Sequence, residues 1–231
     1  MIYRFLIFFL AIIVFGLAAC KNNDEVFPVV IPTNLNVVNA SGDTLNYYLN
    51  GTRQNNSSSL YPGGQSTYIV EPAGLQSYQF KNLGGFSVLF SVPLTLQGST
   101  QTNIYYSLYV GGPSANDAFV TMDQLFTDTV TNSTQIKFVN ASPSTGNLDF
   151  YVGDTVKYQS LAFKGATSFY ATGSGLKQVM IYKTGTSAPI VDTAITFEPG
   201  SIYTVFSQGI INGKGTAAFS IGTVVNSSAA Y

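Results

Sequence analysis

Apolar and polar residues alternate along much of this chain, and turn-forming residues interrupt the alternation at regular intervals. Leu45, Tyr47 and Leu49 are separated by polar or amphipathic residues, and Leu148, Phe150 and Val152 repeat the pattern further along. A period of two places each trio on one face of a β-strand. No long stretch combines a 3.6-residue period with helix-forming residues, so the pattern predicts an all-β protein.

The same module occurs twice in the chain. The phrase LNVVNAS at Leu35–Ser41 returns as IKFVNAS at Ile136–Ser142. The similarity continues downstream, where the matched pairs are Tyr68 with Tyr170, Gly74-Leu75 with Gly175-Leu176, and Ile104-Tyr105 with Ile202-Tyr203. About seven short strands per copy, separated by turn signals, are typical of a small sandwich. We therefore expect two tandem Ig-like antiparallel β-sandwich domains, at residues 33–122 and 135–226, with a polar linker at 123–134 and a tail at 227–231.

The repeated Asn-Ala-Ser has two interpretations. Asn and Ser at the end of a strand could line a ligand site. Alternatively, the Asn side chain could accept a hydrogen bond from the backbone two residues on and close a turn. The structural interpretation is the simpler one, because a strand that ends in such a turn needs nothing more.

The first twenty residues predict export and lipidation. Arg4 precedes an apolar run at Phe5–Ala19 that is shorter than the ~20 residues needed to span a bilayer. Leu17-Ala18-Ala19-Cys20 resembles a bacterial lipobox, and Cys20 is the single cysteine of the chain. We expect a signal peptide at 1–19, lipidation at Cys20 and a lipidated tether at 20–32; the alternative is an ordinary signal peptide with an incidental cysteine. Lys21, in place of Asp, favours the outer membrane, and the side of that membrane stays open.

Composition excludes several function classes. Charged residues are 9% of the chain and the net charge is −1, so no basic surface is available for nucleic acid. The chain has no His, which excludes His-dependent catalytic triads and His-ligated zinc. Asp149 and Glu198 of the second copy correspond to Asn46 and Gln97 of the first, so a paired-carboxylate site is not repeated. We expect no enzyme activity, no metal and no cofactor.

Three motifs of the second copy resemble the domain-of-unknown-function family numbered 4397. They are Val139–Pro143, Leu148–Gly153 and Tyr203-Thr204-Val205. The first copy matches less well, with Gly42, Asn46 and Tyr105-Tyr106-Ser107 at the corresponding places. The resemblance implies a cell-envelope β-sandwich protein of the Bacteroidetes type, often a lipoprotein and often in tandem copies. It implies no activity.

Four Asp-Thr-aliphatic triplets resemble the O-glycosylation sequon of Bacteroidetes. Their threonines are Thr44, Thr129, Thr155 and Thr193. We expect a glycan on at least one of them; the alternative is that Asp-Thr merely opens a strand after a turn.

The leading functional hypothesis is a lipid-anchored, non-catalytic binding or adhesion-type module of the cell envelope, held at the membrane through Cys20, with an unidentified glycan or protein partner. One alternative is a structural spacer without a specific ligand. The other is a glycan-binding accessory lipoprotein of a polysaccharide-uptake system, with Tyr47, Tyr48 or Tyr151 as a stacking platform.

Overall fold

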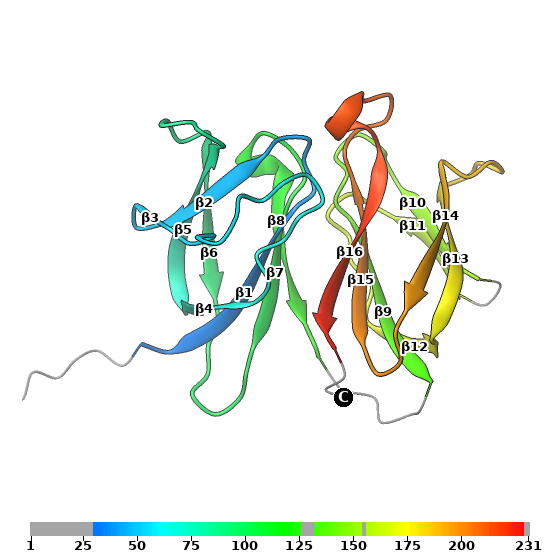
Figure 1. Cartoon of the computed structure of the whole chain (residues 1–231), viewed down its shortest axis with the longest axis horizontal. Coiled ribbons are helices and arrows are strands. Elements are labelled where there is room, and N and C mark those ends of the chain that lie inside the picture. Colours follow the sequence, from blue (N-terminus) through cyan, green and yellow to red (C-terminus); the bar gives the residue numbers. More distant parts are fainter. Residues whose placement is uncertain (1–29, 126–131, 154–155, 229–231) are drawn as a thin grey trace, which may run out of the picture. The chain divides into compact units, whose positions relative to one another are not determined.

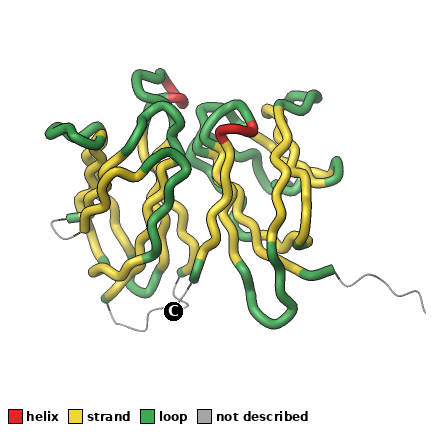
Figure 2. Tube along the Cα trace, turned by 180° about the vertical axis from the view of Figure 1, so that it is seen from behind, coloured by secondary structure: helices red, strands yellow, loops and turns green. Residues whose placement is uncertain are grey.

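The computed structural model describes residues 30–125, 132–153 and 156–228, and Ile31–Tyr231 forms one compact unit. These residues are all-β apart from two short 3₁₀ turns, η1 (Ala115–Asp117) and η2 (Gly215–Ala217) (Figures 1 and 2). The strands form four small sheets, two in each repeat, which make two sandwich-like halves. The predicted all-β class and the tandem arrangement are therefore confirmed, with eight strands per repeat in the described part where about seven were expected.

The first repeat is built from two four-stranded sheets. One has the order β4-β1-β7-β8 and the other β3-β2-β5-β6. The strands are β1 (Pro32–Asn39), β2 (Leu45–Leu49), β3 (Thr52–Arg53), β4 (Ile69–Pro72), β5 (Gly74–Asn82), β6 (Phe90–Leu96), β7 (Tyr105–Val110) and β8 (Ala118–Asp123).

The second repeat has the same two sheets in the same strand order, β12-β9-β15-β16 and β11-β10-β13-β14. Because β8 ends at Asp123 and β9 begins at Ser133, strands extend into both ends of the segment expected as a linker. The strands are β9 (Ser133–Asn140), β10 (Leu148–Val152), β11 (Val156–Leu161), β12 (Tyr170–Gly173), β13 (Gly175–Lys183), β14 (Val191–Phe197), β15 (Ile202–Gln208) and β16 (Ser220–Ser227).

The prediction of purely antiparallel sandwiches is wrong for one strand pair in each repeat. β1 pairs with β7 in parallel, and β9 pairs with β15 in parallel. Alternation of apolar residues reports which side chains face a core and carries no information on strand direction. The strands of each parallel pair are separated by nearly the whole repeat, so no hairpin constrains their direction.

The alternating residues fill one core in each repeat, as predicted. Leu45, Tyr47 and Leu49 are buried in the first core, and Leu148, Phe150 and Val152 in the second. The Asn50-Gly51 turn between β2 and β3 has φ of 50° and 78°. These angles fit a two-residue hairpin of the kind that Asn-Gly favours.

The repeated Asn closes a turn at the end of the first strand of each repeat. The Oδ1 of Asn39 accepts from the N–H and the hydroxyl of Ser41, at 3.0 and 2.7 Å, and its Nδ2 donates to the carbonyl of Leu60 at 2.8 Å. The Nδ2 of Asn140 likewise donates to the carbonyl of Leu161 at 3.0 Å. The structural interpretation of the repeated phrase is confirmed, since each Asn ties the strand end to a leucine 21 residues further along the chain.

Strand pairing corrects the alignment of the two copies by one residue. Leu35 opposes Ile69 and Tyr106, whereas the equivalent Ile136 opposes Tyr170 and Tyr203. Tyr106-Ser107-Leu108 is therefore the counterpart of Tyr203-Thr204-Val205, and Tyr68 is the counterpart of Phe169. In this register the first copy resembles the family motif more closely than the sequence alignment indicated.

Candidate functional site

The two repeats share a third apolar cluster that lies between them. Its members come from the strands that carry the repeated phrase and from their neighbours. They are Val38, Ala40, Tyr109, Val139, Ala141, Phe206 and Val224, with Phe119 packed against them. Strands β7 and β15 are therefore buried on both faces, one toward their own core and one toward the other repeat.

A buried polar network crosses this junction beside the apolar cluster. Lys137 of β9 forms an ion pair with the Oδ1 of Asp123 at the end of β8, and the two side chains are 3% and 0% exposed. The other carboxylate oxygen, Oδ2, accepts from the hydroxyls of Tyr68 at 2.7 Å and Ser107 at 2.6 Å. Thr121 donates to Oδ1 at 3.2 Å, so the carboxylate has four donors.

The network then returns to the second repeat. The Nδ2 of Asn226 donates to the hydroxyl oxygen of Tyr68 at 2.8 Å, and Thr204 donates to the Oδ1 of Asn226 at 2.7 Å. Burial raises the pKa of Tyr68 well above its ordinary value, and the neighbouring charge of Asp123 raises it further. Tyr68 therefore stays a neutral donor that links Asp123 of one repeat to Asn226 of the other.

Both residues of the ion pair have neutral counterparts in the other repeat. Lys137 occupies the position of Asn36, and Asp123 occupies the position of Asn226. The bond from Ser107 to Asp123 corresponds to the bond from Thr204 to Asn226. The first repeat has the acid and the second has the base, so the opposite charges meet only where a first repeat contacts a second repeat.

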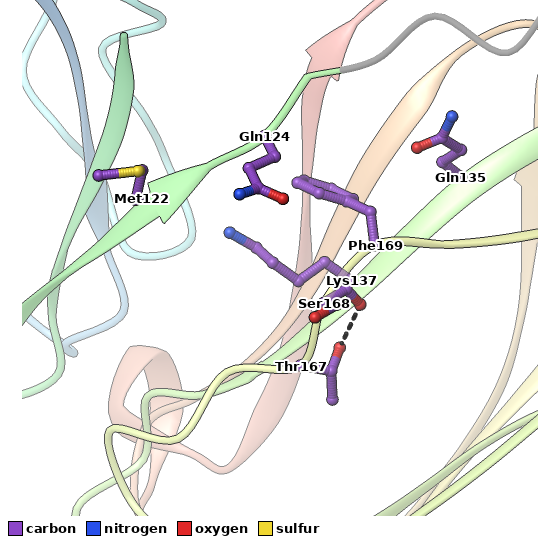
Figure 3. A pocket seen from close by; sticks show the side chains of 7 residues that line it. All are labelled: Met122, Gln124, Gln135, Lys137, Thr167, Ser168 and Phe169. Carbon is purple, nitrogen blue, oxygen red and sulfur yellow. Dashed lines mark hydrogen bonds between the residues drawn. The ribbon is translucent and has the colours of Figure 1, made fainter.

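A pocket opens beside this network and takes residues from both repeats (Figure 3). Its volume is about 270 Å³. In Figure 3 the Lys137 side chain extends from β9 toward the end of β8, and its Nζ lies 5.0 Å from the centre of the Phe169 ring. The lining side chains are amides, hydroxyls, one aromatic ring and one thioether: Met122, Gln124, Gln135, Lys137, Thr167, Ser168 and Phe169.

The pocket chemistry suits recognition of a small neutral polar ligand. Amide and hydroxyl groups can donate and accept, and an aromatic face can pack against an apolar patch of a ligand. The Lys137 ammonium is held by Asp123 and by the hydroxyl of Thr121 at 3.2 Å. An anionic ligand would have to compete with a buried carboxylate for this ammonium, so charge does not select the ligand.

A second polar cluster is buried within the first repeat. Glu71 of β4 is 4% exposed, and its Oε1 has no hydrogen-bond partner among the described residues. Burial raises the pKa of Glu71 to about 7. Burial also raises the pKa of Tyr78, and the nearby Glu71 raises it further. The second repeat has Thr172 and Val179 at these positions, so the fold itself does not require the acid.

Asp149 and Glu198, two acids of the second repeat that lack an acidic counterpart in the first, lie in different surroundings. Asp149 accepts from the N–H of Ser160 at 2.7 Å and from the hydroxyl of Thr184 at 2.6 Å. Glu198 is exposed on the loop before β15. Among the described residues, no group of three or more His, Cys, Asp or Glu could hold a metal ion.

The sequence-predicted modification sites are not brought together. Thr44, before β2, and Thr193, in β14, are half-buried and belong to different repeats. Thr129 and Thr155 lie outside the described residues, as do the predicted signal peptide and Cys20. Within residues 30–125, 132–153 and 156–228, no helix has both the length and the apolar character to cross a membrane.

The tyrosines expected as a stacking platform also separate. Tyr47 is fully buried in the first core. Tyr48 is half-buried with Lys81 over its ring at 4.5 Å, and Tyr151 packs edge-on against Tyr182 at 5.1 Å. None of the three lines the junction pocket.

The sequence patterns do not predict that Lys137 and Asp123 are partners. Lys137 lies inside the repeated phrase, and Asp123 is the first residue of the expected linker. The available signal was the apolar Val38 and Val139 on the face of the phrase that points away from the repeat's own core. Strands that are apolar on both faces are buried on both faces, and a lysine on such a face requires a partner.

Two overlapping segments, residues 33–151 and 134–228, match the family described as Domain of unknown function (DUF4397). This chain belongs to the DUF4397 family. The matches together cover most of the chain, and each contains one repeat. No curated protein matches.

Among solved structures, a leucine-rich repeat protein from Bacteroides thetaiotaomicron is similar at 14% identity with a TM-score of 0.19. The similarity covers 75% of this chain and 25% of that one, so this DUF4397 chain spans a quarter of the length of that protein. A TM-score at this level carries no argument about fold or function.

Proposed function

We propose that this DUF4397 protein is a lipid-anchored, non-catalytic binding module of the cell envelope. The observation that carries the proposal is the junction pocket, because neither repeat alone could form it. A pocket lined by amides, hydroxyls and one aromatic ring favours binding over covalent chemistry. The Ig-like assignment of each sandwich stays a prediction.

The anchor is the thioether-linked lipid at Cys20, placed in the outer membrane of a bacterium of the Bacteroidetes type. The lipobox-like Leu17–Cys20 and the polar residues after it support this assignment. Mass measurement of the native protein tests it directly. A mature chain that begins at Cys20 and carries acyl chains is expected, and an unprocessed or unlipidated chain would overturn the anchor.

The ligand class that fits the pocket is a glycan unit of about monosaccharide size. A volume of about 270 Å³ is at the small end of ligand pockets and excludes a longer oligosaccharide from full burial. This role matches the glycan-binding accessory hypothesis, with Phe169 and the two glutamines in place of the expected tyrosines. A structural spacer is the competing function.

Ligand-observed NMR with a panel of monosaccharides distinguishes a glycan-binding module from a structural spacer. Gln124 is exposed at the pocket, so Gln124→Leu removes an amide without opening a core. Gln101→Leu is the matched control, because Gln101 is exposed and does not line this pocket. A sugar signal that falls about fivefold in Gln124→Leu, as the loss of one hydrogen bond predicts, and persists in Gln101→Leu supports the binding module. If every sugar in the panel gives no signal, the spacer is favoured.

O-linked glycans at Thr44, Thr129, Thr155 or Thr193 are a further part of the proposal. Thr44 and Thr193 are each partly accessible, which modification of a folded protein requires. A native mass equal to polypeptide plus lipid would exclude glycosylation.

A further inference from the structure

Both repeats keep large apolar side chains exposed at the same positions. Leu75 and Leu176 each follow a glycine that opens a strand, and they are 72% and 71% exposed. Met122 and Val225 oppose the equivalent Tyr106 and Tyr203 and are 52% and 49% exposed. The two copies differ even at buried charged positions, since Lys137 and Asp123 have neutral counterparts. Two exposed apolar positions that both copies share therefore call for an explanation.

These four residues lie at one end of the unit, which we call the apolar end. Strands β5 and β13 begin at this end, and β8 and β16 finish there (Figure 1). The chain also enters here, because the carbonyl of Ile31 accepts from the N–H of Ala73, directly before β5, at 2.9 Å. Ile31 itself is 46% exposed and adds a fifth apolar side chain.

The two repeats present this end on the same side. At the opposite end, the N–H of Gly209 donates to the carbonyl of Ala40 at 3.0 Å, and Thr216 donates to the carbonyl of Gly42 at 2.9 Å. Equivalent ends of the repeats therefore lie next to each other. An apolar group on one repeat is accompanied by its counterpart on the other.

Charge is nearly absent from the described loops of the apolar end. Loops 72–74, 97–104, 173–175 and 198–201 contain Gly, Pro, Ser, Thr, Asn and Gln besides Ala73 and Ile104, with Glu198 as their one charged residue. Lys177, next to Leu176, adds a base. The opposite end has exposed Asp43 and Lys214 and half-buried Asp117, beside the exposed Leu83 and Phe86 of the loop between β5 and β6. An end with apolar tips and neutral polar loops can enter a headgroup region without the cost of dehydrating charges.

We propose that the apolar end rests on a lipid bilayer, with Leu75 and Leu176 inserted at the level of the headgroups. The proposal rests on the anchor at Cys20. The eleven residues that follow Cys20, up to Ile31, span at most ~40 Å, and Ile31 joins the unit at this same end. The tether thus holds the apolar end nearest the membrane.

A bilayer fits these side chains better than a protein partner does. A stable protein interface needs about 20–30 residues on each side around a continuous apolar centre. Here the apolar side chains stand on separate strands with neutral polar loops between them. A bilayer requires no complementary shape, and a lipid anchor is strengthened by any second weak contact with the membrane.

The absence of Trp and the single Cys make the proposal directly testable. The chain from Cys20 to Tyr231 contains the whole compact unit, and its Cys20 thiol can be coupled to a maleimide lipid in vesicles of phosphatidylethanolamine and phosphatidylglycerol. Leu75→Trp and Leu176→Trp each introduce one tryptophan at the apolar end. Phe86→Trp, at a position 98% exposed on the loop between β5 and β6 at the opposite end, is the matched control.

We expect the emission of the tryptophans at 75 and 176 to shift to shorter wavelength and to be quenched by brominated lipid. The tryptophan at 86 should show neither effect. Leu75→Ser with Leu176→Ser should weaken vesicle association of the uncoupled chain by about tenfold or more, the cost of leaving apolar side chains in water. A tryptophan that is quenched only at 86, or at none of the three positions, overturns the proposal.

Chemical coupling separates this result from the anchor itself. If native protein carries no lipid but the coupled chain shows quenching at 75 and 176, the anchor fails and the membrane-facing surface stands. If native protein is lipidated and the coupled chain shows no quenching, the anchor stands and the surface fails. If the tryptophan emission shifts with protein concentration in the absence of vesicles, the apolar end mediates self-association, and the proposal is overturned.

Discussion

Replacing Lys137 by asparagine, the residue at the equivalent position 36, leaves the Asp123 carboxylate buried without a cation. Removing one partner of a buried ion pair costs about 3–5 kcal/mol. Asp123 keeps three hydroxyl donors, from Tyr68, Ser107 and Thr121, so we expect a loss near the lower limit, about 3 kcal/mol.

The reciprocal change, Asp123→Asn, copies Asn226 and leaves the Lys137 ammonium with one hydroxyl and one ring face. We expect a larger loss, about 4 kcal/mol, because fewer groups compensate the buried charge. The double variant removes both buried charges and has asparagine at both positions, as at the equivalent positions 36 and 226, so it should be less destabilised than either single variant.

Urea unfolding followed by far-UV circular dichroism measures all three variants, with a constant m-value as the check for two-state behaviour. Lys183→Asn is the control, because Lys183 is exposed and position 82, its counterpart, already holds asparagine. The control should lie within about 0.5 kcal/mol of the parent. Single-variant losses below about 1 kcal/mol, or a double variant equal to the sum of the singles, would refute the role assigned to the ion pair.

Three further predictions concern the fold. Burial raises the folded-state pKa of Glu71 to about 7, so the protein loses stability as the pH rises from the unfolded-state pKa of Glu71 through 7. In urea titrations, Glu71→Gln should therefore raise the free energy of unfolding by about 2–3 kcal/mol near pH 8 and change it little near pH 4. Gly222→Ala places a Cβ against the ring of Phe206, so the melting temperature of the variant should fall. Gly173→Ala should lower it less, because only the flexible tip of Lys177 lies within 4 Å of the added Cβ. Asn140→Ala removes the donor to the Leu161 carbonyl and should cost about 1–3 kcal/mol in chemical unfolding, a result contradicted by a change below 0.5 kcal/mol.

Sequence patterns predicted the parts of this fold that depend on neighbours along the chain. The cores around Tyr47 and Phe150 follow from alternation, and the Asn50-Gly51 turn follows from residues that tolerate positive φ. Within the described residues, those local features lie where they were expected.

The parts that escaped prediction depend on strands distant in the chain. The parallel pairing of β1 with β7 has no local sequence signature. The one-residue correction that makes Tyr106 the counterpart of Tyr203 depends on which strands pair, and the sequence alone does not show this. The ion pair joins residues in two different sheets, so no strand pattern reports it. The junction pocket, which needs both repeats, escaped for the same reason.

The parallel pairing of β1 also determines how the protein responds to mechanical force. A pull on the chain at Ile31 acts along β1, whose residues Asn34–Asn39 are paired with β7 and whose first residues are paired with β4. Such a pull loads these hydrogen bonds together in shear, instead of opening them one at a time as in a peeled hairpin. The far end of β1 is held by the Asn39 side chain, which bonds to the Leu60 carbonyl. When the protein is pulled from its N-terminal end, β1 is therefore the element that resists unfolding under force.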